Sequence, residues 1–242
     1  MKLFRHALCC ITLYAISTAN AHADDYQINS PQVDEGEAYA QANLNYSGDN
    51  RKNLDHYFSQ VYGVGYGVTR FWSTELDSEI EKSATMSTRL TMLKWANTIV
   101  PFKPGEYWLD AGLYLELDKS MQNHMPNNIE TQLLLEKRLG DFINTANLSL
   151  SHNFGPNRIS GVDSGFSWRT KYHVNDLFEP GIEYYSDFGQ LNRDDDFNRQ
   201  DRVIGPVVQG HFGEVNYDAG VLFGVSQSAH DVTVKLNLEY GF

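Results

Sequence analysis

Charged side chains recur at alternate positions of this chain, and side chains of these types at this spacing could bind ions or take part in catalysis. Between positions 72 and 82, Glu75, Asp77 and Glu79 are each separated by one residue. Successive side chains of a β-strand point to opposite faces, so this spacing places the three carboxylates on one face. The charged residues selected by this parity are Glu75, Asp77, Glu79, Asp110, Glu116, Glu183, Asp187, Arg169 and Lys171. Carboxylates around a confined watery space favour cations, so we expect binding or passage of a small solute or cation.

Covalent catalysis has weaker support, and no catalytic residue is predicted. The closest pairing of a base with a nucleophile is His152 with Ser149 and Ser151. A general base must reach the hydroxyl that it deprotonates, but strand alternation puts His152 on the face opposite both serines. We therefore expect that the protein is not an enzyme.

Metal and cofactor sites are not predicted either. Both cysteines, Cys9 and Cys10, lie near the N-terminus, where the chain reads as a cleaved leader. His124 and Met125 form a soft-ligand pair in one loop, which alone is too small a donor set for a metal. We expect neither a metal ion nor a cofactor.

The N-terminus carries the pattern of a secretory signal peptide. Lys2 and Arg5 precede an apolar run at positions 7–17, and small residues mark cleavage sites after Ala21 and Ala23. The run is too short to span a bilayer as a helix, which takes about 20 residues. The predicted organisation is a signal peptide at 1–23, a short periplasmic lead-in at 24–35 and a β-barrel at 36–242.

Alternation of apolar and polar residues continues to the end of the chain and predicts about twelve strands. Two of them are irregular: 87–99 changes parity, which a bulge would restore, and Pro206 interrupts 202–211. One of the clearest is 107–117, where Tyr107 begins an apolar face. The predicted strands are 37–47, 57–69, 72–82, 87–99, 107–117, 130–139, 142–154, 162–173, 180–189, 202–211, 215–226 and 232–242.

The last strand carries a specific resemblance. Its apolar face contains Val232, Val234, Leu236, Leu238, Tyr240 and Phe242, and the last of these is the final residue of the sequence. A terminal strand of this kind resembles the closing strand of bacterial outer-membrane β-barrels. The resemblance implies that these residues form a membrane-insertion signal read by the barrel-insertion machinery. It also implies outer-membrane lipid and lipopolysaccharide as partners and the outer membrane of a Gram-negative bacterium as the location.

The connections between the predicted strands agree with this resemblance. Odd-to-even links are longer on average than even-to-odd links, as in barrels with long external loops and short periplasmic turns. An even number of strands also returns the C-terminus to the side of the N-terminus, which places both termini in the periplasm. The predicted fold class is all-β, a single antiparallel transmembrane β-barrel of about twelve strands. A soluble lipocalin-like barrel is the alternative, because alternation does not say which face meets solvent.

The formal net charge of -12 argues against a nucleic-acid partner, which needs clustered Lys and Arg. The leading functional prediction is a narrow porin-like or transport-supporting channel, and a packed structural barrel is one alternative. Residues 160–189 resemble copper-resistance outer-membrane barrels in a Gly-Asp loop, an aromatic strand, an acidic-Pro turn and a Phe-Gly strand end. This resemblance makes a metal (copper) resistance-associated barrel the other alternative. Phenol-degradation-associated barrels share these features, so the subfamily stays open.

An outer-membrane lipid hydrolase or protease ranks below these alternatives. The lipid hydrolase would rest on the pairing of His152 with Ser149 and Ser151, and the protease on an acidic loop that His230, from a later loop, could approach. The acidic residues of that loop are Asp194, Asp195, Asp196 and Asp201. Such a loop is more often solvated or binds divalent ions.

Overall fold

The computed structural model describes residues 26–193 and 196–242. The predicted signal peptide, the first two residues of the lead-in, and Asp194 and Asp195 lie outside these residues. Within the described ranges, no helix is long and apolar enough to cross a membrane.

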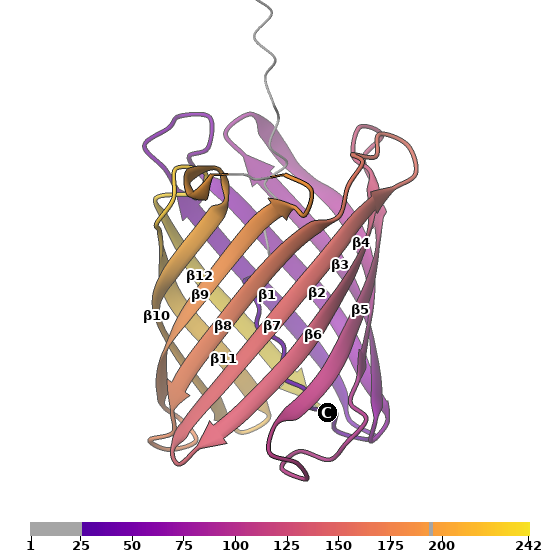
Figure 1. Ribbon diagram of the computed structural model, residues 1–242, viewed down its shortest axis with the longest axis vertical. Helices are drawn as coiled ribbons and strands as arrows, with labels where there is room; N and C mark the ends of the chain where they lie inside the picture. The colour runs from indigo at the N-terminus through magenta and orange to yellow at the C-terminus, as the bar shows by residue number, and fades with distance from the viewer. Residues whose placement is uncertain (1–25, 194–195) are drawn as a thin grey trace, which may run out of the picture.

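The described residues form twelve antiparallel strands that close into a barrel, which confirms the predicted fold class (Figure 1). β1 and β12 pair along their length, from Tyr39 opposite Gly241 to Gly48 opposite Val232. A short 3-10 helix, Phe197–Arg199, precedes β10. The strands are β1 Ala38–Gly48, β2 Tyr57–Thr69, β3 Trp72–Ser83, β4 Met86–Ile99, β5 Asp110–Ser120, β6 Asn127–Leu139, β7 Phe142–Phe154, β8 Asp163–Tyr172, β9 Glu179–Gln190, β10 Asp201–Phe212, β11 Val215–Gly224 and β12 Val232–Gly241.

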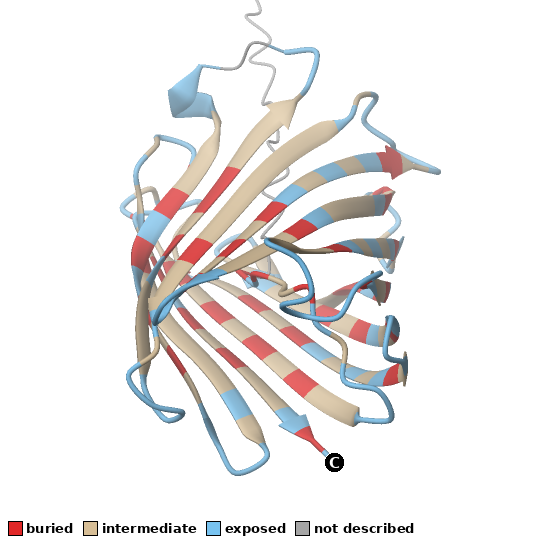
Figure 2. Cartoon of the chain, turned by 60° about the horizontal axis from the view of Figure 1, so that its bottom comes forward, coloured by how far each residue is buried: buried red, intermediate tan, exposed pale blue. Residues whose placement is uncertain are grey.

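Polar side chains face the lumen and apolar side chains face outward. Leu76 is 61% exposed on the outer face, whereas Asn43 and Lys235 are 2% and 1% exposed on the inner face. Figure 2 shows this alternation as buried and exposed bands along individual strands. A soluble barrel would bury its apolar face, so the arrangement excludes the lipocalin-like alternative and gives the fold of an outer-membrane β-barrel.

Both irregular strands are present. In β4 the pairing to β3 shifts between Met92 and Leu90, so Thr91 is the bulged residue and the predicted bulge is confirmed. The buried Thr91 hydroxyl donates to the carbonyl of Glu79 at 3.2 Å. In β10 the pairing to β11 passes from Ile204 to Val207 and leaves out Pro206, which has no N–H to donate.

The predicted start of the fifth strand is wrong. β5 begins at Asp110, and Tyr107 lies in the preceding turn, where its ring packs against Phe102 with centroids 4.7 Å apart. Pro104 cannot donate a backbone hydrogen bond, and Gly105 has a φ of 76°, so the chain turns here instead of extending. The Gly105 N–H donates to the Asp110 carboxylate at 2.6 Å, which fixes the turn to the first residue of the strand.

The two ends of the barrel differ. We call the end that holds Ala38 and Gly241 the proximal end, and the opposite end the distal end (Figure 1). Odd-to-even loops lie at the distal end. Loop length distinguishes the two ends only in part, because the distal turn 84–85 is short and the proximal connection 100–109 is long.

The described part of the predicted lead-in lies inside the barrel. Residues 26–35, which we call the lumenal segment, appear in Figure 1 as an indigo thread between the front strands. At its end, the Gly36 N–H donates to the Gly67 carbonyl at 2.7 Å, and a Cβ on Gly67 would lie 1.9 Å from the Asp34 oxygen. Gly63 and Gly65 are likewise covered by the side chains of Asp77 and Tyr39. Because these inner positions of β2 are glycines, the side chains of Asp77 and Tyr39 and the backbone of Asp34 occupy space that larger β2 side chains would fill.

We expect Gly205→Ala to destabilise the barrel. A Cβ there would lie 1.9 Å from the Val221 carbonyl oxygen of β11, and backbone cannot move aside as a side chain can. The expected loss in the free energy of unfolding is about 1–3 kcal/mol, measured by urea unfolding in detergent micelles. Gly48→Ala is the matched control, because its nearest atom would be 3.6 Å away. Equal stability of the two variants would contradict this packing argument.

Candidate functional site

The carbonyl oxygen of Tyr26 is the most heavily bonded point of the lumenal segment. It accepts hydrogen bonds from Lys235 Nζ at 2.9 Å, Tyr185 Oη at 2.9 Å and Asn237 Nδ2 at 3.2 Å. The Tyr26 ring packs edge-on against the Tyr185 ring, with centroids 5.3 Å apart. Residues of β9 and β12 therefore form a cradle around one carbonyl and one aromatic ring of the segment.

An ion network lies directly behind this cradle. Lys235 Nζ is 2.5 Å from a Glu183 oxygen and 2.9 Å from an Asp218 oxygen. Arg169 is 3.6 Å from Glu183 and 3.8 Å from Asp218. Two carboxylates thus balance two cations where the side chains of Lys235 and Glu183 are fully buried. A buried charge is tolerated when it is paired, so these groups neutralise one another and are not free to select ions.

Asn147 on β7 holds the next part of the lumenal segment. Its side-chain oxygen accepts from the Asn29 N–H at 2.8 Å, and its amide donates to the Asn29 carbonyl at 2.8 Å. The Ser30 hydroxyl donates to Glu136 at 2.9 Å. The segment is not a strand, and side chains of the wall satisfy these groups.

An apolar cluster on the inner wall packs against Tyr26 and Ile28, the large apolar side chains at the start of the lumenal segment. Tyr26 and Ile28 are buried at 7% and 5% exposure. They belong to one cluster with wall and loop residues, namely Tyr185, Val203, Val207, Leu222 and Ala229. The lumen is therefore polar in most places but has an apolar patch on β9, β10 and β11 that fits the segment.

The predicted carboxylates of β3 form a second wall. Glu75 accepts from the Tyr39 hydroxyl and the Gln41 amide, each at 2.7 Å. Gln41 also donates to Asp77 at 3.1 Å. Glu79 lies 3.3 Å from the ammonium of Lys94. These three acids are brought together on one side of the lumen, as their spacing indicated.

The other predicted lumenal residues are spread along the barrel. Lys171 pairs with Glu179 at 2.6 Å, and Glu116 accepts from the Tyr114 hydroxyl. Asp110 lies at the proximal end of β5. Asp187 accepts from the Gly189 N–H at 2.7 Å near the distal end of β9. The structure therefore joins Arg169 with Glu183, keeps the β3 acids together, and leaves Asp110 and Asp187 at opposite ends.

A cavity of about 590 Å³ remains beside the lumenal segment. Its lining is mainly polar and belongs largely to the proximal half. Among the lining residues are Glu37, Glu75, Arg138, Lys171, Asp218 and Glu239. Carboxylates and cations thus surround the same space from different strands.

A clamp between two loops covers the distal end of the β1–β12 seam. The guanidinium of Arg51 donates to Asp49 and to the carbonyls of Gln227 and Ala229. Its hydrogen bonds to Asp49 hold the pKa of that carboxyl below its usual value. His230 stacks on Tyr57 with centroids 5.6 Å apart, and burial lowers the pKa of its imidazole.

The terminal strand presents its apolar side chains outward. Val234 and Tyr240 are about half-exposed, Phe242 is 69% exposed, and the Phe242 N–H donates to the Ala38 carbonyl at 2.8 Å. Leu236 and Leu238 share this face by alternation, between β1 and β11. Their role as an insertion signal stays a prediction.

The residues considered for covalent chemistry are apart. His152 is exposed on the outer face, opposite Ile129, and its Nδ1 lies 2.7 Å from the Gly161 carbonyl oxygen. Ser149 and Ser151 belong to the lumenal parity of β7. Within residues 26–193 and 196–242, no group of three or more His, Cys, Asp or Glu side chains is arranged to hold a metal ion.

Sequence reasoning missed the cradle and the lumenal segment. Tyr26 and Ile28 alternate in an otherwise polar stretch, and this is the signal that could have marked the segment as buried. Lys235 shares the polar face of the last strand, but its partners lie 52 and 209 residues away in the chain. Strand parity alone does not identify such distant partners.

Comparison with known proteins supports the fold. No protein-family model and no curated protein matches the chain. An outer membrane channel from Pseudomonas putida F1 is similar in structure, with a TM-score of 0.64 and 12% identity over 87% of this chain and 97% of that chain. The outer membrane protein Omp33 of Acinetobacter baumannii has a TM-score of 0.49 and 10% identity, covering 86% of this chain and 99% of that chain. The translocator domain of autotransporter NalP from Neisseria meningitidis has a TM-score of 0.49 and 11% identity, covering 86% and 89%.

We expect Asn147→Ala to loosen the lumenal segment. The substitution removes two hydrogen bonds to Asn29, each contributing about 1 kcal/mol, so exposure of the segment should rise about fivefold or more. The measurement is the rate at which a Cys introduced by Ser30→Cys reacts with a small water-soluble thiol reagent. Ser149→Ala, also on the lumenal face of β7, is the control and should leave the rate unchanged. Equal rates in Asn147→Ala and the control would contradict the role of Asn147.

We expect the distal clamp to loosen between about pH 7 and 5 because of His230. The imidazole takes a proton at its ordinary pKa of 6.5 when exposed but only at lower pH when buried, so acid favours the opened loop. Asp49 has a lowered pKa, so its contribution persists until the pH falls below its ordinary value of 3.8. Arg51 and Asp231 also face His230, and the hydrogen bond from Arg51 to Asp49 raises the pKa of the Arg51 guanidinium, so this cation persists across the window.

Hydrogen exchange of residues 225–231 at the two pH values measures this loosening. His230→Gln should remove the pH dependence of exchange in this window, whereas the exposed His124→Gln should not. An unchanged pH dependence in His230→Gln would exclude His230 as the titrating group.

Proposed function

We propose that the protein is a narrow outer-membrane channel for small solutes, which performs no covalent chemistry and is obstructed by its own lumenal segment. The observation that carries the proposal is the way this segment is held. Side-chain hydrogen bonds and one apolar patch fix it, and it is not a strand of the wall. A segment held in this way can leave while all twelve strands stay paired.

The similar channel from Pseudomonas putida F1 supports the proposal at the level of fold. The cavity of about 590 Å³ supports it at the level of the lumen, because space for hydrated solutes already exists beside the segment. In the orientation that we propose, the proximal end faces the periplasm. The distal clamp then lies on the external side.

The charges around the cavity would orient a passing solute. Carboxylates of β3 lie on one wall, while Arg138 and Lys171 line the cavity from β6 and β8. Opposite charges across a narrow space with walls of low dielectric create a transverse field. Since Arg169 is balanced within the ion network, Glu75 and Asp77 are the residues that we propose give the channel a preference for cations.

Removal of the predicted leader would make the lumenal segment a short free end. Cleavage after Ala21 or Ala23 leaves Tyr26 within a few residues of the new N-terminus. Most hydrogen bonds contribute only about 0.5–1.5 kcal/mol net, so the segment is held more weakly than a barrel strand. We propose that the closed lumen interchanges with a less populated open one.

A packed structural barrel is the second candidate. The fully buried pair of Lys235 and Glu183 favours it, because a neutralised interior needs no solute to be stable. The two candidates differ in one measurable property, which is conductance through the lumen.

We expect a disulfide between the segment and the wall to control conductance. In the double variant Asn29→Cys with Asn147→Cys, the oxidised protein should stay closed and the reduced protein should open in planar bilayers. In the parent, two hydrogen bonds join the Asn29 backbone to the Asn147 side chain, so the two residues are neighbours. The same molecules are compared before and after reduction, so a folding defect affects both states equally.

The β3 carboxylates should set the ion preference of the open state. Glu75→Gln with Asp77→Asn should lower the cation-to-anion permeability ratio, and Glu106→Gln in an exposed proximal turn should not. Absence of conductance in the parent and in the reduced double variant would reject the channel and favour the packed barrel.

A further inference from the structure

A row of side chains crosses the outer face of the barrel at its distal rim. Tyr46 of β1 is the direct register partner of Phe58 of β2, and Phe58 is the direct partner of Lys82 of β3. The Tyr46 and Phe58 rings have centroids 4.7 Å apart. The Lys82 ammonium lies 5.8 Å from the centroid of the Phe58 ring. Two aromatic rings and one cation thus form a continuous outward-facing strip.

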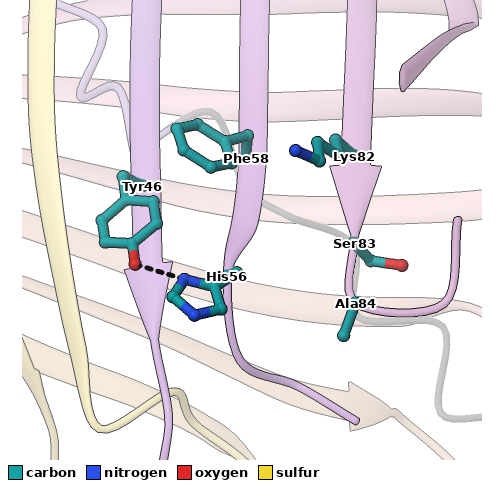
Figure 3. Close-up of a pocket in the computed structure, with 6 residues that line it drawn as sticks. All are labelled: Tyr46, His56, Phe58, Lys82, Ser83 and Ala84. Atoms are coloured by element: carbon teal, nitrogen blue, oxygen red, sulfur yellow. Dashed lines mark hydrogen bonds between the residues drawn. The ribbon is translucent and has the colours of Figure 1, made fainter. Parts of the chain in front are cut away.

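The strip lies in a hollow of about 550 Å³. His56, Ser83 and Ala84 complete its lining from the adjoining loops (Figure 3). Figure 3 shows Phe58 between Tyr46 and Lys82, with the Lys82 side chain directed toward the ring. The sheet separates this hollow from the lumen, so it is not part of the proposed conduction path.

His56 fixes the shape of one side of this hollow. Its backbone has a φ of 57°, a left-handed conformation that is uncommon for residues other than glycine. The Tyr46 hydroxyl lies 2.7 Å from His56 Nδ1, and His56 Nε2 lies 3.3 Å from Asp55. Both ring nitrogens are therefore engaged, and the imidazole positions the Tyr46 ring instead of presenting a free donor.

Lys82 supplies the charge of the hollow. In the described part of the chain it forms no ion pair, and its close contact is the Phe58 ring. The protein as a whole is acidic, with a formal charge of -12, so an anionic membrane surface is repelled unless a local cation offsets the repulsion. An unpaired ammonium above an aromatic floor offers such a contact to a phosphate whose attached groups are apolar or sugar-like.

We propose that this hollow binds the phosphorylated sugar headgroup of an outer-leaflet glycolipid. Lys82 pairs with the phosphate, and the rings of Tyr46 and Phe58 contact the sugar and the first acyl carbons. The inference rests on the proposed orientation, in which the distal rim lies at the level of the outer-leaflet headgroups. It does not depend on whether the lumen conducts.

Native mass spectrometry of the folded protein in detergent tests this site with diphosphorylated lipid A as the probe. Lys82→Gln should weaken binding by roughly tenfold or more, since a charge-assisted contact is lost. Lys82→Arg should retain binding. Lys137→Gln is the matched control, because Lys137 lies 5.0 Å from the Trp108 ring but at the proximal end, and it should bind as the parent does.

Two further probes separate the sources of the phosphate. Lipid A without phosphates should bind the parent as weakly as diphosphorylated lipid A binds Lys82→Gln. Inorganic phosphate at equal concentration should not compete, because it lacks the groups that contact the rings. Equal binding by the parent and Lys82→Gln, or an equal loss in Lys137→Gln, would overturn the proposal. Conductance of Lys82→Gln should equal that of the parent, so failure of this site and failure of the channel give different results.

Discussion

The Lys235 ammonium must be neutralised inside a closed lumen, and this requirement organises the middle of the barrel. Glu183 and Asp218 approach it from β9 and β11, and Arg169 from β8 balances the second carboxylate. Lys235 Nζ also donates a hydrogen bond to the Tyr26 carbonyl. Pairing of a buried charge therefore determines both which strands are tied together and where the lumenal segment is fixed.

The lumenal segment makes contacts of two physical kinds. Its carbonyl and amide groups meet side-chain donors and acceptors, which are individually weak and can exchange with water. Tyr26 and Ile28 instead occupy an apolar patch, which water does not fill favourably. The polar contacts are the weaker part of the hold, and the apolar patch favours the position of the segment in the lumen.

Much of the fold could be predicted because lipid imposes one periodic rule on every strand. β2 and β7 begin and end where alternation predicted, and even the bulge in β4 follows from a break in parity at Thr91. The start of β5 was wrong because Pro104 and Gly105 override alternation locally. The β3 acids lie on the lumenal face, where Glu79 approaches Lys94. The partners of Lys235 and Asn147 could not be predicted, since they depend on which distant residues the closed cylinder brings to one level.

The position of the lumenal segment also constrains the order of assembly. A closed cylinder has no side opening, and the segment is joined to β1, one of the two strands whose pairing closes it. The thread is therefore either enclosed as β12 meets β1 or inserted afterwards through an open end. Closure of the β1–β12 seam and placement of the lumenal segment are therefore linked by topology.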